Sequence, residues 1–230
     1  MLDVLARGAI EVEGRVIGSS NQALLVRVTT PSASVRACYK AEAGERPLWD
    51  FPDGLWRREV AAYELDVALA TGLVPPTVGR DDAPFGPGSL QLWVEDNGED
   101  HYFTLRERPE FAEWFAALAA FDVVANNADR KSGHVLFDGS RCWAIDNGLC
   151  FHQQEKLRTV VWEFAGLRIA PDLLGRLDAF ARGDGRALAG WLAPHEVALA
   201  RQRAAELVES SSYPTPDEDR DWPPYPWPLV

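Results

Sequence analysis

The stretch from Phe121 to Gly148, FDVVANNADRKSGHVLFDGSRCWAIDNG, constrains the fold more than any other part of the chain. It places Asp129, Lys131 and His134 in one polar segment, which is followed by two short apolar runs and then by Asp146. The apolar runs flank Asp-Gly at 138–139, a pair that favours the tight turn of a β-hairpin. Two carboxylates on either side of a short hairpin, with a lysine beside the first, suit a site for a metal ion and phosphate groups.

The spacing of these residues matches the needs of phosphoryl transfer. Asp129 and the residue five places after it reproduce the D-x-x-x-x-N spacing of a kinase catalytic loop, in which the aspartate accepts the proton of the acceptor hydroxyl. Lys131 is placed to reach the transferred phosphate. Asp146, across the hairpin, is expected to be the main metal ligand, because its hard oxygen atoms are of the kind that Mg²⁺ prefers.

A lysine and a glutamate upstream complete the set. Residues 9–40 alternate apolar and polar side chains and predict three strands, the last ending at Lys40. Residues 55–72 predict a helix with Glu59 early in it. Kinases hold the α- and β-phosphates of ATP with such a lysine–glutamate pair. The alternatives are a solvated lysine at a strand end, and Glu64 as the partner in place of Glu59.

Two further segments are expected to contact the nucleotide. The turn at Gly18, Ser19 and Ser20 lies where a kinase has its glycine-rich loop, although an ordinary hairpin turn would have the same residues. Residues 88–95, GSLQLWVE, predict a strand that leads into the hinge between two lobes. Trp93 and Val94 are then the expected neighbours of the adenine ring.

The rest of the chain predicts an α+β fold of two lobes. An apolar helix is expected over 110–126, and helical segments are expected over 160–167, 170–183, 185–192 and 194–211, with Pro171 and Pro194 in first-turn positions. The expected division is an N-terminal lobe of sheet and one helix (1–96), a helical C-terminal lobe (97–209) and an acidic tail rich in Pro and Trp (210–230). We expect the tail to dock on the domain or on a partner.

The chain resembles the phosphatidylinositol 3- and 4-kinase-related superfamily at Asp122, at Asn127-Ala128-Asp129-Arg130 and at IDNGLCF over 145–151. The type II phosphatidylinositol 4-kinases and the HipA-like bacterial kinases are the more similar branches, and the whole chain is similar to a small actinobacterial group described as phosphatidylinositol-kinase-like. The resemblance implies an atypical, two-lobed protein-kinase-like fold that binds ATP with Mg²⁺ or Mn²⁺.

His134 is the departure from that pattern, which has Asn at this position. A neutral imidazole is a borderline nitrogen donor and suits transition metals better than Mg²⁺. The possible consequences are catalysis with one metal held by Asp146, a preference for Mn²⁺, or nucleotide binding with little transfer. The simplest alternative is a histidine that only caps the loop by hydrogen bonds.

Several polar residues are expected to have structural roles. Asp122 is expected to bond backbone N–H groups of the catalytic loop, Asn126 and Asn127 to set its turn, and Arg130 to stabilise the lobe. His152 and His195 are expected to be surface or capping residues. The three cysteines lack metal-ligand spacing and predict buried thiols in a reducing cytosol.

Charge and hydropathy exclude some partners. A formal net charge of −12 argues against nucleic acid and anionic membranes as partners of the general surface. No apolar run approaches a membrane span, and the first residues lack the apolar core of a signal peptide. The sequence therefore predicts a cytoplasmic ATP-dependent phosphotransferase acting on a soluble small molecule or protein. The alternative is a pseudokinase that binds nucleotide or a protein partner.

Overall fold

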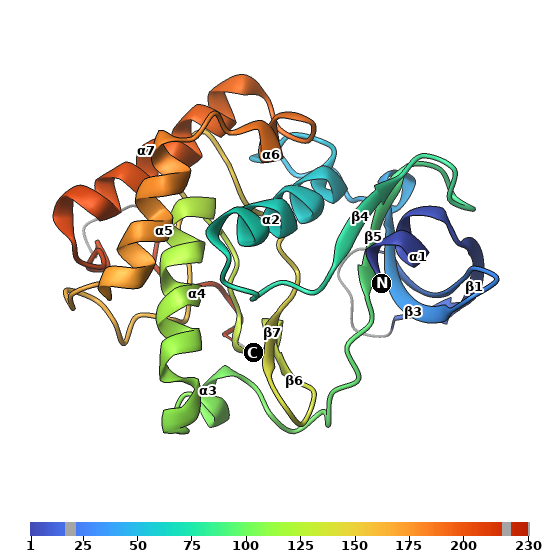
Figure 1. The fold of residues 1–230 in the computed structure, drawn as a ribbon, viewed down its shortest axis with the longest axis horizontal. Helices are drawn as coiled ribbons and strands as arrows, with labels where there is room; N and C mark the ends of the chain where they lie inside the picture. Colours follow the sequence, from blue (N-terminus) through green and yellow to red (C-terminus); the bar gives the residue numbers. More distant parts are fainter. Residues whose placement is uncertain (17–21, 218–221, 230) are drawn as a thin grey trace.

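A computed structural model describes residues 1–16, 22–217 and 222–229 (Figure 1). Five antiparallel strands form one sheet in the order β1-β2-β3-β5-β4. Their bounds are Ala9–Arg15, Ala23–Thr29, Ser34–Ala41, Thr77–Arg80 and Gly88–Leu92 for β1 to β5 in turn. The three strands predicted over residues 9–40 and the strand predicted from residue 88 are all present.

The sheet buries one of its faces under a short N-terminal helix, α1 (Leu2–Arg7). Leu5 of α1 packs with Val26, Tyr39 and Leu90 in a small core of their own. The sequence did not predict α1. A helix of six residues has little stability by itself, so this one depends on packing against the sheet rather than on a local signal.

The helical part of the molecule lies beside the sheet, toward the left of Figure 1. Its helices are α3 (Tyr102–Leu105), α4 (Ala112–Ala125), α5 (Pro171–Arg182), α6 (Arg186–Ala189) and α7 (Pro194–Ser210). Pro171 and Pro194 occupy first-turn positions of α5 and α7, as predicted. This part contains the larger hydrophobic core, which includes Phe115, Phe121 and Leu177.

Helix α2 (Leu55–Leu69) joins the two parts, and Figure 1 shows it lying between the sheet and helices α5 and α6. We expected this helix to belong to the N-terminal lobe. Its Ala61, Leu65 and Leu69 are nevertheless buried in the large core of the helical part. Glu59 is therefore fixed with respect to the helices as well as to the sheet. The division between residues 96 and 97 stays a prediction.

The predicted hairpin is present as β6 (Val135–Phe137) and β7 (Cys142–Ala144). Its turn depends on Asp138, whose Oδ1 accepts hydrogen bonds from the backbone N–H groups of Ser140 and Arg141. Gly139 has a φ of 92°, a left-handed conformation that suits a residue without Cβ. The turn thereby fixes where the chain returns to Asp146.

One helix prediction was wrong. Residues 160–167 form turns and extended backbone. Their N–H groups are used elsewhere: Val160 N–H donates to Arg130 O and Gly166 N–H donates to Tyr213 O. This segment pairs with the catalytic loop and with the C-terminal tail, and a helix over 160–167 would engage the N–H of Gly166 within itself.

The described part of the tail docks on its own chain. Tyr213 is buried and its hydroxyl donates to Ala116 O of α4 at 2.8 Å. Pro224 O accepts hydrogen bonds from Thr159 N–H and from the Trp162 indole. Leu229 O accepts a 2.8 Å hydrogen bond from Ser132 N–H, so the tail reaches the catalytic loop.

Two of the minor expectations need correction. Cys142 and Cys150 are buried free thiols, whereas Cys38 is only partly buried. His152 is buried and not at the surface, with its ring against Phe51, and it has the alternative capping role because its Nδ1 accepts a 3.0 Å hydrogen bond from the backbone N–H of Gln154. His195 is exposed, as expected. Among the residues described, no helix is both long and apolar enough to cross a membrane.

Candidate active site

Three charged side chains from distant parts of the sequence meet beside the sheet. Lys40 lies near the end of β3, Glu59 in the second turn of α2, and Asp146 directly after the hairpin. The Lys40 ammonium forms an ion pair with Glu59 Oε1, and its Nζ lies 2.7 Å from Asp146 Oδ1. The lysine thus contacts both the glutamate and the metal-loop aspartate that the sequence predicted.

The charges of this cluster reinforce one another. The Lys40 ammonium holds the pKa of Asp146 well below its usual range, although burial acts in the opposite direction. Burial alone would lower the pKa of Lys40, but the Asp146 and Glu59 carboxylates raise it well above its usual value. Lys40 is therefore a fixed cation and Asp146 a fixed anion at neutral pH.

Asp129 and Lys131 form the second part of the site. Asn127 Oδ1 accepts a 3.0 Å hydrogen bond from the backbone N–H of Asp129, which sets the turn of the loop. Lys131 Nζ lies 3.1 Å from Asp129 Oδ2. Burial raises the pKa of Asp129 above its ordinary value, and Lys131 partly opposes this shift. A carboxylate with a raised pKa is a better proton acceptor than an ordinary aspartate.

A buried polar network supports the catalytic loop. Arg130 and Asp122 are fully buried and form an ion pair, with Arg130 Nη2 3.1 Å from Asp122 Oδ1. Asp122 also accepts hydrogen bonds from the side chains of Asn127 and Thr159. The expectation that Asp122 bonds backbone N–H groups was therefore wrong, since its recorded donors are side chains. Arg130 has the stabilising role that was expected.

The same network joins the catalytic loop to the loop that bears Asp146. Arg130 Nη2 donates to Asn147 Oδ1 at 2.5 Å, and Arg130 Nη1 donates to Ile145 O at 2.7 Å. The backbone N–H of Asn147 donates to Glu59 Oε2 at 3.0 Å. The sequence did not assign Asn147 this role, because its partner Glu59 lies 88 positions away.

Two hollows meet at Lys40 and Asp146. The first, of about 350 Å³, is walled by β2, β3 and β5, by Trp93 and Val94, and by the hairpin residues Leu136 and Ile145. The second, of about 250 Å³, is walled by loop 44–48, by the start of α2 and by Asp129. Lys40 and Asp146 line both. The pair therefore lies where the two hollows meet, and the two hollows together form one groove.

The structure describes the positions of some, but not all, of the residues predicted to contact the nucleotide. Trp93 and Val94 line the first hollow, but the backbone N–H of Trp93 donates to Arg36 O and is not available to a ligand. Residues 18–20, the predicted counterpart of a glycine-rich loop, lie outside the described residues. The roles of all the predicted site residues stay predictions.

His134 also lines the first hollow. It closes the short 3-10 turn η3 (Ser132–His134), and its Nε2 lies 3.4 Å from Asp146 Oδ2. Burial lowers the pKa of His134 from 6.5 to about 4. The imidazole is therefore neutral at physiological pH.

The described side chains at this site supply too few ligands for a divalent cation, so the phosphate groups of a nucleotide would have to supply others. Within the described ranges, no group of three or more His, Cys, Asp or Glu side chains could hold a metal ion. Mg²⁺ is commonly bound by one or two carboxylates together with substrate phosphates and water. Asp146, whose side chain is 45% exposed, supplies one carboxylate at the junction of the two hollows. The donor set therefore fits a cation that arrives with phosphate groups.

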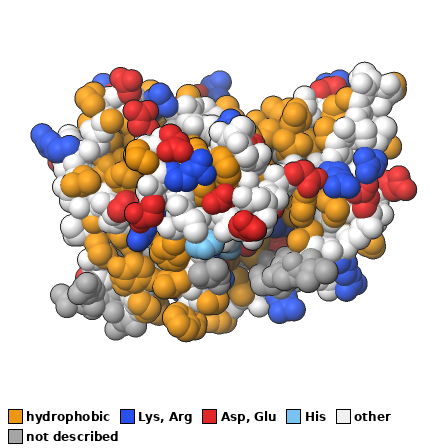
Figure 2. All heavy atoms as spheres, turned by 90° about the horizontal axis from the view of Figure 1, so that it is seen from below, with side chains coloured by type: hydrophobic (Ala, Val, Ile, Leu, Met, Phe, Trp, Pro, Cys, Tyr) orange, Lys and Arg blue, Asp and Glu red, His pale blue; other side chains and the backbone are white. Residues whose placement is uncertain are grey.

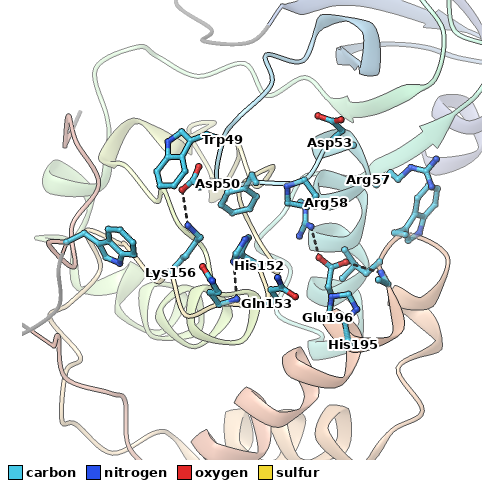
Figure 3. Close-up of a pocket in the computed structure, with 18 residues that line it drawn as sticks. Trp49, Asp50, Asp53, Arg57, Arg58, His152, Gln153, Lys156, His195 and Glu196 are labelled. Atoms are coloured by element: carbon cyan, nitrogen blue, oxygen red, sulfur yellow. Dashed lines mark hydrogen bonds and ion pairs between the residues drawn. The ribbon is translucent and has the colours of Figure 1, made fainter.

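A larger cavity of about 760 Å³ lies on the other side of α2 and contains none of the predicted site residues (Figure 3). Two pairs of its charged side chains point toward each other. Lys156 Nζ lies 2.8 Å from Asp50 Oδ2, and Arg58 Nη2 lies 2.5 Å from Glu196 Oε1. Arg58 also donates to Cys150 O. The pair of Arg58 with Glu196 joins the start of α2 to α7, directly before Glu59.

Comparison with known proteins places the chain in a family. Protein Rv2133c of Mycobacterium tuberculosis (strain ATCC 25618 / H37Rv) is 38% identical over 265 aligned positions, which cover 98% of this chain and 94% of that protein. The chain belongs to the Rv2133c family. No protein-family model matches the sequence of this Rv2133c family member.

Comparison with solved structures shows which proteins share the fold of this Rv2133c family member. A Fam20 protein of hydra, solved with sugar, aligns with a TM-score of 0.59 at 12% identity, covering 91% of this chain and 86% of that one. The proinflammatory kinase CtkA of Helicobacter pylori aligns with a TM-score of 0.53 at 10% identity, covering 90% and 95%. The chain therefore has an atypical kinase-like fold of two lobes, as its sequence predicted.

Proposed function

We propose that this Rv2133c family member is an ATP-dependent phosphotransferase, an atypical kinase that acts on a hydroxyl of a soluble small molecule or protein. The observation that carries the proposal is the pair of hollows that meet at Lys40 and Asp146. The first hollow suits the nucleoside, because it lies between the sheet and the hairpin. The second suits the acceptor, because Asp129 lines it.

In the proposed reaction the acceptor oxygen attacks the γ-phosphorus of ATP. The bond between that phosphorus and the β–γ bridging oxygen breaks, and ADP leaves with the electron pair. Asp129 takes the proton of the hydroxyl, and Lys131 stays with the transferred phosphate. Lys40, oriented by Glu59, holds the α- and β-phosphates.

Asp146 would hold Mg²⁺ or Mn²⁺ together with the phosphates of the nucleotide. A divalent cation bound there would neutralise part of the negative charge of the phosphates. The chain's own contribution is to keep Asp146 ionised, which the contact with Lys40 does.

The chemistry of the surface favours a soluble acceptor over a lipid. The resemblance to phosphatidylinositol kinases suggests a lipid, but the formal net charge of −12 opposes approach to an anionic bilayer or to nucleic acid. On the face drawn in Figure 2, Lys and Arg side chains are interspersed with Asp and Glu. We further propose that the chain works in the cytoplasm.

A second candidate function is supported by His134. An imidazole stands where the kinase pattern has a metal-binding asparagine, and it lies beside Asp146. A pseudokinase that binds nucleotide and signals by its conformation would tolerate this change. The two candidates differ in whether bound ATP is turned over.

The test is turnover of γ-labelled ATP by the purified full chain with Mg²⁺ or Mn²⁺. We expect autophosphorylation or slow ATP hydrolysis that is lost in Asp146→Ala and strongly reduced in Asp129→Asn. Asp178→Ala, at a partly exposed position of α5 outside the proposed site, is the matched control and should leave turnover unchanged. Turnover that survives Asp146→Ala would refute the site. Calorimetric binding of ATP without turnover would favour the pseudokinase.

A further inference from the structure

His134 has two nitrogen atoms with different partners. Nδ1 lies 3.4 Å from the backbone nitrogen of Lys131, whose N–H donates to it. Nε2 lies on the other side of the ring, 3.4 Å from Asp146 Oδ2. The side chain is 13% exposed, so these two contacts determine its environment more than water does.

The partners determine which nitrogen carries the proton. A neutral imidazole has one N–H and one lone pair, and the nitrogen that accepts a hydrogen bond is the one without a proton. Since Nδ1 accepts from Lys131, the proton of the neutral ring resides on Nε2. The opposite arrangement would place an N–H against the N–H of Lys131, which has no other recorded acceptor among the described residues.

This arrangement does not present Nε2 as a metal ligand. A metal binds imidazole through a nitrogen lone pair, and the nitrogen that faces Asp146 has none. In the kinase pattern the residue at this position supplies an amide oxygen to a second cation. In this chain Nε2 of His134 lies 3.4 Å from Asp146 Oδ2 instead.

We propose that His134 donates its Nε2–H to Asp146 and takes the place of a second metal ligand, so that the nucleotide-loaded site holds one divalent cation. This inference rests on the proposed binding of a metal–nucleotide complex. His134 is then a positioning residue. It holds Oδ2 of Asp146 while Lys40 contacts Oδ1, and the carboxylate is oriented from both sides.

The tautomer can be measured without nucleotide, metal or activity. Long-range ¹H–¹⁵N spectra of the ¹⁵N-labelled full chain distinguish an Nε2–H ring from an Nδ1–H ring. The sequence has four histidines, and the His134→Asn variant identifies which signal is lost. We expect the Nε2–H form for His134 at pH 7. An Nδ1–H form, or a protonated ring, overturns the proposal.

The number of cations is measured by counting bound Mn²⁺ with electron paramagnetic resonance in the presence of a non-hydrolysable ATP analogue. We expect one Mn²⁺ per chain in the natural protein and two in His134→Asn, which restores an amide oxygen. Two in the natural protein, or one in both proteins, overturns the claim that His134 replaces the second ligand. The circular dichroism of the variant should match that of the natural chain, which shows that the comparison is between folded proteins.

The two measurements separate this inference from the proposed function. Absence of any Mn²⁺–nucleotide binding in both proteins refutes the proposed function and, with it, the cation count. The tautomer measurement on the free protein still decides whether His134 donates to Asp146.

Discussion

Lys40 Nζ lies 2.7 Å from Asp146 Oδ1, although the two residues are 106 positions apart. The contact joins the central strand β3 to the loop that follows the hairpin. Because Lys40 also pairs with Glu59, one ammonium connects the sheet, helix α2 and the expected metal loop. A phosphate group entering the groove would meet this ammonium and would compete with the carboxylates for it.

The first prediction concerns that ammonium. Lys40→Met should lower ATP turnover by about 10²- to 10³-fold, the scale of effect seen when one preorganised electrostatic donor is removed from an active site. Arg36→Met, which removes an exposed cation from the same strand, is the matched control and should change turnover little. Steady-state kinetics and calorimetric titration of ATP provide the measurement. Equal turnover in the two variants would contradict the assigned role of Lys40.

The second prediction concerns the pH dependence of Asp129. Its carboxylate must be ionised to accept a proton, so the rate should fall as the pH drops through its pKa, which burial has raised. Lys131 lowers that pKa, and Lys131→Met should therefore raise it further. The acidic limb of kcat/KM against pH should move to higher pH.

Lys131→Arg is the control for that experiment, because it keeps a cation near Asp129. Its acidic limb should stay near that of the natural protein, even if its plateau is lower. An acidic limb that does not move in Lys131→Met, or that moves to lower pH, would show that another group limits the rate.

Much of the site could be predicted from the sequence because local signals specify it. Asp-Gly at 138–139 fixed the hairpin, and the spacing from Asp129 to Asp146 then followed from the lengths of two short strands. The alternation of apolar and polar residues placed Lys40 near the end of a strand, and the helical spacing of apolar residues placed Glu59 in α2. The prediction that Lys40 and Glu59 contact each other also needed the known lysine–glutamate pair of kinases.

The parts that could not be predicted depend on long-range contacts. Residues 160–167 have a helical composition, but their N–H groups pair with Arg130 and Tyr213. The buried pairing of Arg58 with Glu196 spans 138 positions and has no local signature. The sequence predicted that the tail docks, but it gave no signal for the particular contact between the Leu229 carbonyl and the backbone N–H of Ser132.

The third prediction concerns the buried pair of Asp122 and Arg130. Asp122→Asn leaves the Arg130 guanidinium uncompensated inside the protein, and should lower the free energy of unfolding by about 3–5 kcal/mol. Asp178→Asn removes an ion pair of α5 in which Arg182 is 80% exposed, and should cost about 0.3–0.5 kcal/mol. Urea unfolding measures both. Similar losses in the two variants would mean that the network below the catalytic loop contributes little to stability.

The fourth prediction tests whether the tail is part of the folded domain. Tyr213 is 5% exposed and its ring packs against Phe164. Burial raises the pKa of Tyr213 to about 12, so the phenol stays protonated and donates to Ala116 O. Tyr213→Phe should cost about 1 kcal/mol for the lost hydrogen bond. Tyr213→Ala should cost about 3–5 kcal/mol because it also empties a buried site.

Tyr225, which is 43% exposed in the same tail, provides the matched control. Tyr225→Ala should change the free energy of unfolding by less than about 0.5 kcal/mol, as surface substitutions usually do. A docked tail requires the two alanine variants to differ, whereas a tail that leaves the domain in solution would make both neutral. Because Leu229 O accepts from Ser132 N–H, undocking would also free a backbone group of the catalytic loop. Loss of ATP turnover in Tyr213→Ala at temperatures where the variant stays folded would therefore show that the tail positions that loop.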